Sequence, residues 1–248
     1  MGWFGRALRA AMFRSGCMFL PVSRDRSPGD SMTAMEFQEG GRQVDALTVN
    51  GLTRRFGPRL VLDDISFAVP RGRIVVLVGP NGGGKTTLLR CVVGADRPDA
   101  GEVLLEGRPM DETDPWVRST VAAALDDVDC FPDLSVVEHL ELLAFAHGGD
   151  GRCVAEVVAE LGLDTARDQL PATLSSGQRR RLALASCFVR PRRLLVLDEP
   201  EQRLDVLGQQ WLAERLLRER AAGTGVLMAS HDAELVQRIA DTRIEIGA

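Results

Sequence analysis

The residues best suited to chemistry form one run, Gly79-Pro80-Asn81-Gly82-Gly83-Gly84-Lys85-Thr86-Thr87. This run matches the pattern G-x-x-x-x-G-K-[ST], in which glycines let successive backbone N–H groups turn inward around phosphate oxygens. In such a loop the lysine reaches the outer phosphates and the first hydroxyl ligates Mg²⁺. We therefore predict a phosphate-binding loop in which Lys85 and Thr86 take these two parts.

The flanking residues supply the structural context that this pattern requires. An apolar run, Ile74 to Val78, precedes the loop and is typical of a strand buried on both faces. Leu88-Leu89-Arg90 follows it and is expected to form the first turn of a helix. Lys85 is the only lysine among 30 Lys and Arg residues. A compact point charge on a slim stem suits this loop better than a planar guanidinium does.

Composition excludes several other classes of protein. A chain of 248 residues with 45% hydrophobic residues can form one large domain or two small ones. The net charge of −5 argues against a nucleic-acid groove as the main surface, so no nucleic-acid partner is expected. The five cysteines show no metal-ligand spacing. No apolar run approaches the roughly 20 residues of a membrane-spanning helix.

The chain consists of two regions that differ in composition, residues 1–43 and 44–248. Residues 1–43 mix arginines with aromatic residues and then become polar, so we expect a disordered extension; it is either a membrane-surface segment or an upstream start-codon assignment. The folded part is expected over 44–248. Its expected strands are Ala46–Val49, Val61–Val69, Ile74–Val78, Glu102–Leu105, Leu194–Leu197, Gly225–Ala229 and Arg243–Ile246.

The middle of the folded part departs from this strand pattern. Ser135 and Glu138 form a capping box that opens a helix running to about His147. A second helix, Val154–Leu161, is expected to end at Gly162 in a left-handed cap. We interpret this stretch as a helical insertion, at about 127–180, between two halves of a mostly parallel sheet. Later helices are expected at about Leu204–Arg220 and at Ala233–Ile239.

Further polar residues follow the buried strands. Asp198 and Glu199 end one strand, where Asp198 could complete a Mg²⁺ shell opposite Thr86 and Glu199 could polarise an attacking water. His231 ends the next strand, at the same edge of the sheet. Leu174 to Arg181 opens a helix, and its N–H groups with the Ser175 hydroxyl suit an anion. Its three arginines, Arg179, Arg180 and Arg181, are expected on a solvated face.

With these motifs in this order, the chain resembles the nucleotide-binding subunit of ATP-binding-cassette (ABC) transporters over about residues 44–248. The resemblance implies an α/β P-loop NTPase core, a mostly parallel sheet with flanking helices, together with an N-terminal antiparallel β subdomain and a helical subdomain insertion. The matching residues are Gly79–Thr86 for Walker A, Leu194–Asp198 for Walker B, Glu199 for the catalytic carboxylate, Leu174–Gln178 for the signature, His231 for the switch histidine, Asp205 for the D-loop and Phe56 for the aromatic that stacks on adenine.

The same resemblance implies the activity and the partners. It implies hydrolysis of ATP with Mg²⁺, with Glu199, His231 and Lys85 as the catalytic group. Two subunits would pair head to tail, so that Ser175, Gly177 and Gln178 of one complete the ATP site of the other. The subunit would lie in the cytoplasm, on the membrane face, against a separately encoded integral membrane permease. The short C-terminus and the segment 133–138 favour export.

Four positions depart from the family pattern. Asp126 lies where the family usually has Gln, and a carboxylate there could still ligate Mg²⁺ with altered charge. Ser176 replaces the first glycine of the signature, and Gly83 lies where Ala is common. Glu201-Gln202-Arg203 replaces the usual Thr-x-Gly, which leaves the D-loop geometry open.

Two other functions stay possible at this point. One is a soluble ABC-type ATPase that acts without a permease, as in iron–sulfur assembly. The other is a nucleotide-dependent regulator that hydrolyses ATP weakly. This hypothesis rests on Asp126, which lies at the usual Gln position.

Overall fold

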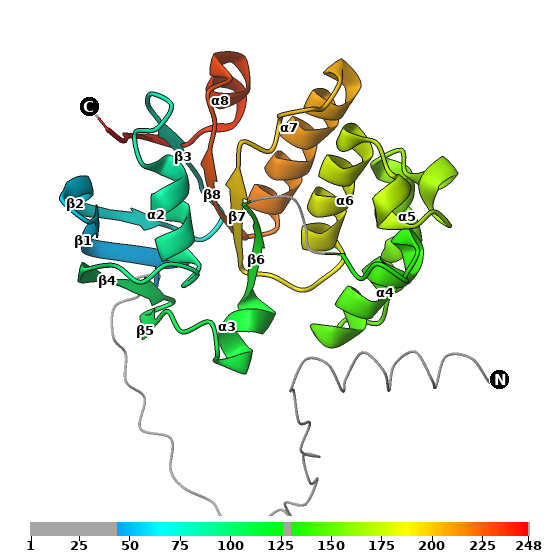
Figure 1. Cartoon of the computed structure of the whole chain (residues 1–248), viewed down its shortest axis with the longest axis horizontal. Helices are drawn as coiled ribbons and strands as arrows, with labels where there is room; N and C mark the ends of the chain where they lie inside the picture. Colours follow the sequence, from blue (N-terminus) through cyan, green and yellow to red (C-terminus); the bar gives the residue numbers. More distant parts are fainter. Residues whose placement is uncertain (1–43, 126–129, 248) are drawn as a thin grey trace, which may run out of the picture. The chain divides into compact units, whose positions relative to one another are not determined.

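The strand before the phosphate-binding loop, β3 (Ile74–Val78), lies inside a five-stranded sheet (Figure 1). The computed structural model describes residues 44–125 and 130–247, so the predicted extension over 1–43 and Asp126 lie outside the described residues. All pairings in this sheet are parallel. Its order is β6-β7-β8-β3-β9, with β6 at Val121–Ala124, β7 at Leu194–Asp198, β8 at Gly225–Ala229 and β9 at Thr242–Glu245.

The central strands are aliphatic and buried because both faces of the sheet are covered. Every residue of β7 and of β8 is buried. Alternate residues of β3 belong to two different hydrophobic clusters, Val75 and Leu77 to one and Ile74 and Val76 to the other, so the two faces of the strand pack against different parts of the fold. The continuous apolar runs in the sequence are therefore confirmed as strands of a two-sided parallel core.

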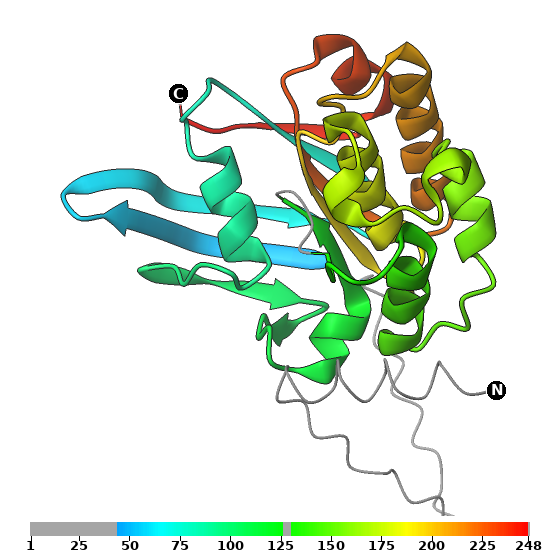
Figure 2. The ribbon, with the colours of Figure 1, turned by 45° about the vertical axis from the view of Figure 1, so that its right-hand side comes forward.

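A second sheet is antiparallel and has the order β2-β1-β4-β5. β1 (Leu47–Phe56) runs seven residues beyond the predicted end at Val49, because Arg54 to Phe56 pair with β2 (Arg59–Val69) across the turn at Gly57. Gly57 has a φ of 58°, which suits this tight turn. Figure 2 shows the resulting hairpin projecting from the parallel sheet. The sheet is completed by β4 (Ala100–Leu105) and β5 (Arg108–Pro109).

The helix after the loop begins earlier than predicted. α2 spans Lys85–Val92, so Lys85 and Thr86 belong to its first turn instead of preceding it. Gly84 precedes the helix with a φ of 103°, a left-handed conformation that glycine reaches without strain. A further helix, α3 (Pro115–Thr120), leads into β6 and is capped by Asp114, whose carboxylate accepts from the backbone of Trp116.

Between β6 and β7 the described residues form helices and no strand. They are α4 (Val136–Ala146), α5 (Val154–Glu160), the 3₁₀ turns η1 (Asp164–Ala166) and η2 (Pro171–Thr173), and α6 (Ser176–Phe188). The predicted capping box of α4 is present, with Ser135 and Glu138 bonded in both directions. Gly162 has a φ of 61°, as predicted for a left-handed cap. No helix in the described part of the chain is long and apolar enough to cross a membrane.

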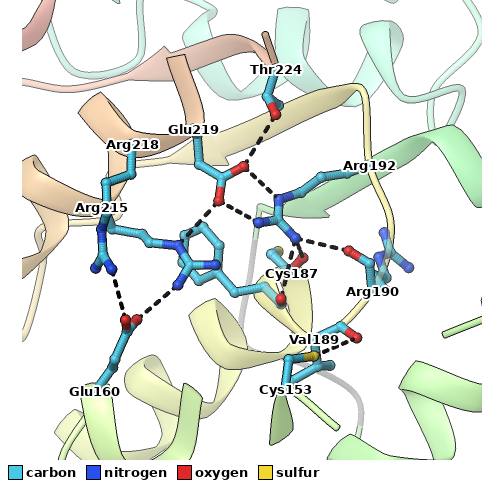
Figure 3. A network of polar contacts seen from close by, with 11 residues as sticks. Cys153, Glu160, Cys187, Val189, Arg190, Arg192, Arg215, Arg218, Glu219 and Thr224 are labelled. Atoms are coloured by element: carbon cyan, nitrogen blue, oxygen red, sulfur yellow. Dashed lines mark hydrogen bonds and ion pairs between the residues drawn. The ribbon is translucent and has the colours of Figure 1, made fainter. Parts of the chain in front are cut away.

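A polar network joins these helices to α7 (Val206–Ala221) (Figure 3). In the sequence, α7 follows β7 and precedes β8. Glu219 of α7 pairs with Arg192, in the loop before β7, and with Arg215, at 3.1 Å. Arg215 and Arg218 also pair with Glu160 of α5, each at 2.8 Å. This network holds α5, α7 and the approach to β7 together. The remaining helix, α8 (Ala233–Ile239), precedes β9.

Candidate active site

The phosphate-binding loop is folded around the side chain of Lys85. Lys85 Nζ donates to the carbonyl oxygens of Gly79 and Pro80, at 2.9 and 3.0 Å, and the lysine is only 5% exposed. Gly79 has a φ of 141°, and a Cβ there would lie 2.2 Å from the Ile246 carbonyl oxygen, which follows β9. Glycine is therefore required where the loop passes this backbone.

Thr86 and Asp198 meet although 112 residues separate them. Thr86 Oγ1 donates to Asp198 Oδ2 at 2.6 Å. Thr86 lies in the first turn of α2 and Asp198 ends β7, so the sheet brings them to one edge. A hydroxyl and a carboxylate are the oxygen ligands that Mg²⁺ prefers, and a nucleotide-bound Mg²⁺ needs only one or two of them from the protein. These two residues fit the predicted metal position.

Glu199 follows β7 in a left-handed conformation, with a φ of 45°. Its backbone N–H donates to the Ala229 carbonyl at 2.9 Å, which keeps it in register with β8. Its Oε1 lies 3.5 Å from His231 Nδ1, and its Oε2 accepts a hydrogen bond from Gln202. The contact with Gln202 was not predicted. Left-handed backbone at a non-glycine residue is uncommon and often marks a functional position.

Arg180 is buried, so the prediction that all three arginines of α6 lie on a solvated face is wrong for this residue. Arg180 is 6% exposed, and its guanidinium donates to the carbonyl oxygens of Asp198 and Glu199, at 2.5 and 2.7 Å. The prediction was wrong here because the burial of Arg180 depends on α6 packing against the end of β7. Arg179 bonds to the Leu174 carbonyl, and Arg181 pairs with Asp205 at 2.8 Å.

A cavity of about 470 Å³ opens beside the loop. It is lined by Phe56, Arg59, Val61, Asn81, Gly82, Gly84, Lys85, Thr86, Thr87 and Glu199. Phe56 comes from the end of β1, is 48% exposed, and has the Arg54 guanidinium 4.7 Å from its ring centroid. An aromatic face, a glycine-rich loop and a carboxylate thus surround one space. Arg59 was not predicted; its position in the β1–β2 hairpin gave no local signal.

The predicted signature residues do not line this cavity within the described chain. Ser175 and Gln178 form a capping box at the start of α6, with the Ser175 hydroxyl accepting from Gln178 N at 3.2 Å. A Cβ on Gly177 would lie 3.3 Å from the Arg203 carbonyl, so this turn packs against the D-loop. Asp205 caps α7 through Gly208 N.

Comparison with known proteins agrees with this geometry. A family model described as ABC transporter matches residues 62–202. The chain belongs to the ABC transporter family. It is 36% identical to the SkfA peptide export ATP-binding protein SkfE of Bacillus subtilis, over 75% of this chain and 78% of that protein. It is 39% identical to the aliphatic sulfonates import ATP-binding protein SsuB 1 of Nocardia farcinica, over 79% and 76%.

A solved structure gives the same assignment. The ATP binding subunit of an ABC transporter superposes with a TM-score of 0.76 at 28% identity, over 81% of this chain and 85% of that one. The predicted α/β P-loop NTPase fold of the ABC type is thereby confirmed. The chain is an ABC ATP-binding subunit, and as a member of this family it is an ATPase.

Proposed function

We propose that this ABC subunit binds ATP in the cavity beside the phosphate-binding loop and hydrolyses it to drive transport through a separately encoded membrane permease. Two cassettes would pair head to tail around ATP, and hydrolysis would release them. The helical insertion over about 127–180, which contains α4 and α5 and the start of α6, would pass this motion to the permease. Under this proposal the subunit works in the cytoplasm, at the membrane face.

The roles of the site residues belong to this proposal. Lys85 would bind the outer phosphates, and Phe56 would stack on adenine. Thr86 and Asp198 would hold Mg²⁺, which when bound supplies positive charge to the phosphates. Asp126, the third predicted metal ligand, keeps that role only as a proposal. Ser175, Gly177 and Gln178 would complete the ATP site of a partner cassette; Ser175 is exposed, and Gly177 and Gln178 are half-buried.

One observation carries the assignment of hydrolysis. Glu199 lines the cavity together with Lys85 and Thr86, and its two carboxylate oxygens contact His231 and Gln202. A carboxylate fixed at a phosphate site can take the proton of an attacking water while the bond from the terminal phosphorus to its bridging oxygen breaks, which yields ADP and phosphate. His231 would orient this carboxylate and the terminal phosphate.

The direction of transport is the finer part of the proposal. One relative is an export protein by name and another is an import protein. We propose export, because the sequence of the segment 133–138 resembles that of exporter subunits. A soluble ABC-type ATPase of the iron–sulfur assembly type is the alternative, and a permease gene beside this one would argue against it.

The test compares wild type with Glu199→Gln. We expect wild type to hydrolyse ATP, and the variant to bind ATP, to remain dimeric in size-exclusion chromatography and to turn over at least about 100-fold more slowly. Glu234→Gln is a matched control, since Glu234 is an exposed carboxylate in the first turn of α8. Equal turnover of Glu199→Gln and wild type would contradict the proposed role of Glu199.

A further inference from the structure

Glu201 is a buried carboxyl group that does not line the ATP cavity and has no role in the site described above. It lies two residues after Glu199 and is 4% exposed. Its Oε1 accepts a hydrogen bond of 2.5 Å from Ser230 Oγ, whereas its Oε2 has no hydrogen-bond partner in the described part of the chain. Burying a carboxyl group with so few partners is unfavourable, so its position calls for an explanation.

Ser230 connects this carboxyl group to the end of β8. Its backbone N–H donates to the Leu77 carbonyl at the end of β3, at 3.2 Å. Its hydroxyl accepts from the backbone N–H of Asp232 at 3.1 Å while donating to Glu201. Ser230 and Asp232 are the two neighbours of His231, so this hydroxyl determines the path of the backbone on both sides of the histidine.

The chain of contacts ends at the reacting carboxylate. His231 is otherwise weakly held, since its side chain is 55% exposed, and its Nδ1 lies 3.5 Å from Glu199 Oε1. A side chain so exposed depends on its backbone for orientation. The backbone, in turn, is held through Ser230 by Glu201.

We propose that Glu201 is a positioning residue for His231: by accepting a hydrogen bond from Ser230, it fixes the turn from β8 into α8 and keeps the imidazole facing Glu199. The inference rests on the proposed role of His231 in ATP hydrolysis. Burial raises the pKa of the Glu201 carboxyl, and the hydrogen bond from Ser230 offsets part of this rise. Glutamine at this position keeps an oxygen in the place of Oε1, which can accept the same hydrogen bond from Ser230.

The experiment is a double-mutant cycle on ATP turnover by the full chain, with Glu201→Ala and His231→Ala alone and combined. We expect Glu201→Ala to lower kcat by roughly 5- to 50-fold through misplacement of a reacting group. KM for ATP should change less than about 2-fold, because Glu201 does not line the cavity and the substitution leaves Lys85 and Phe56 in place. Glu201→Gln should recover kcat to within about 3-fold of wild type, since its amide oxygen still accepts from Ser230. In the His231→Ala background, Glu201→Ala should have no further effect.

Two further variants keep the test decisive. Ser230→Ala removes the same hydrogen bond from the other side and should lower kcat as Glu201→Ala does; it carries the test if Glu201→Ala does not fold. Glu219→Gln is the matched control. Glu219 is also a buried carboxylate, only 6% exposed, and it accepts a hydrogen bond from the hydroxyl of Thr224. This variant should lower stability in urea without lowering the kcat of the folded protein.

The outcomes separate this inference from the proposed function. The inference is overturned if His231→Ala lowers kcat and the double variant loses the product of the two single losses, because Glu201 then does not act through His231. It is also overturned if Glu201→Gln does not restore kcat. If His231→Ala turns over ATP at the wild-type rate, the proposed role of His231 fails first, and the inference falls with it.

Discussion

The Thr86 hydroxyl and the Asp198 carboxylate are hydrogen-bonded, with 2.6 Å between the two oxygens. One residue opens α2 and the other ends β7, so this bond joins the phosphate-binding loop to the neighbouring strand end. It leaves two oxygen atoms side by side, and one of the two residues, Thr86, lines the cavity.

The first prediction concerns this pair. Thr86→Ala removes one proposed Mg²⁺ ligand, so we expect the Mg²⁺ concentration for half-maximal ATPase activity to rise roughly 10- to 100-fold. A Mg²⁺ titration of turnover measures it. Thr113→Ala is the control, because the Thr113 hydroxyl bonds to Asp111 on the surface. An unchanged Mg²⁺ requirement in Thr86→Ala would remove Thr86 from the metal site.

The second prediction concerns the backbone of the loop. An Ala Cβ at position 79 would lie 2.2 Å from the Ile246 carbonyl oxygen, whereas at position 82 it would meet nothing within 4 Å. Gly82→Ala should therefore cost only the left-handed strain, about 1 to 2 kcal/mol. Gly79→Ala should cost distinctly more and abolish ATP binding. Urea unfolding and nucleotide binding measure both variants, and equal losses would contradict the proposed contact.

A third prediction uses the network in Figure 3. The side chains of Arg192 and Glu219 are 11% and 7% exposed, so Glu219→Ala leaves a buried guanidinium without its charge partner. We expect a loss of about 3 to 5 kcal/mol in the free energy of unfolding. Arg218 is 55% exposed in its pair with Glu160, so Arg218→Ala should cost less than about 1 kcal/mol. Comparable losses in urea would show that burial does not control the strength of these pairs.

A fourth prediction concerns acid stability. His147 Nε2 accepts from Arg190 at 2.8 Å, and Nδ1 donates to the Arg118 carbonyl at 3.1 Å, which requires a neutral ring. Burial, followed by the charge of Arg190, lowers the pKa of His147 from 6.5 to about 4. Between these two values the unfolded chain binds a proton that the folded chain does not, so stability falls as the pH falls.

The matched variant for this effect is His147→Gln, which cannot titrate. Between pH 6.5 and 4, its stability should fall less steeply than that of wild type, by up to about 1.4 kcal/mol per pH unit. His139 is present in both proteins, and burial lowers its pKa in each, so its contribution cancels. Parallel stability curves for the two proteins would mean that His147 titrates normally in the fold.

The centre of the parallel sheet could be predicted because β3, β7 and β8 are short apolar runs with both faces buried. β1 was predicted too short, since Arg54 to Phe56 are held by hairpin pairing and not by burial. α3 was missed although Asp114 and Pro115 carry an N-cap and first-turn signal. That helix has six residues, too few to show a periodicity.

The phosphate-binding loop could be predicted because its chemistry lies in consecutive residues. Arg180 could not be placed, since its partners at Asp198 and Glu199 come from another element. The bond between Glu201 and Ser230 spans 29 residues and likewise has no local signal. Such contacts depend on the packing of helices against strand ends, which a single sequence does not reveal.

The position of β3 between β8 and β9 also bears on how the chain folds during synthesis. Val75 pairs with Thr242, which the ribosome adds 167 residues later (242 − 75). At ordinary elongation rates of 5 to 20 residues per second, the strand that leads into the phosphate-binding loop waits about 8 to 33 s for this neighbour. Until then one edge of β3 is unpaired, and Gly79 lacks the Ile246 backbone against which it packs. A nascent chain released before residue 242 therefore carries every residue of the loop in its sequence but lacks the sheet edge that shapes it.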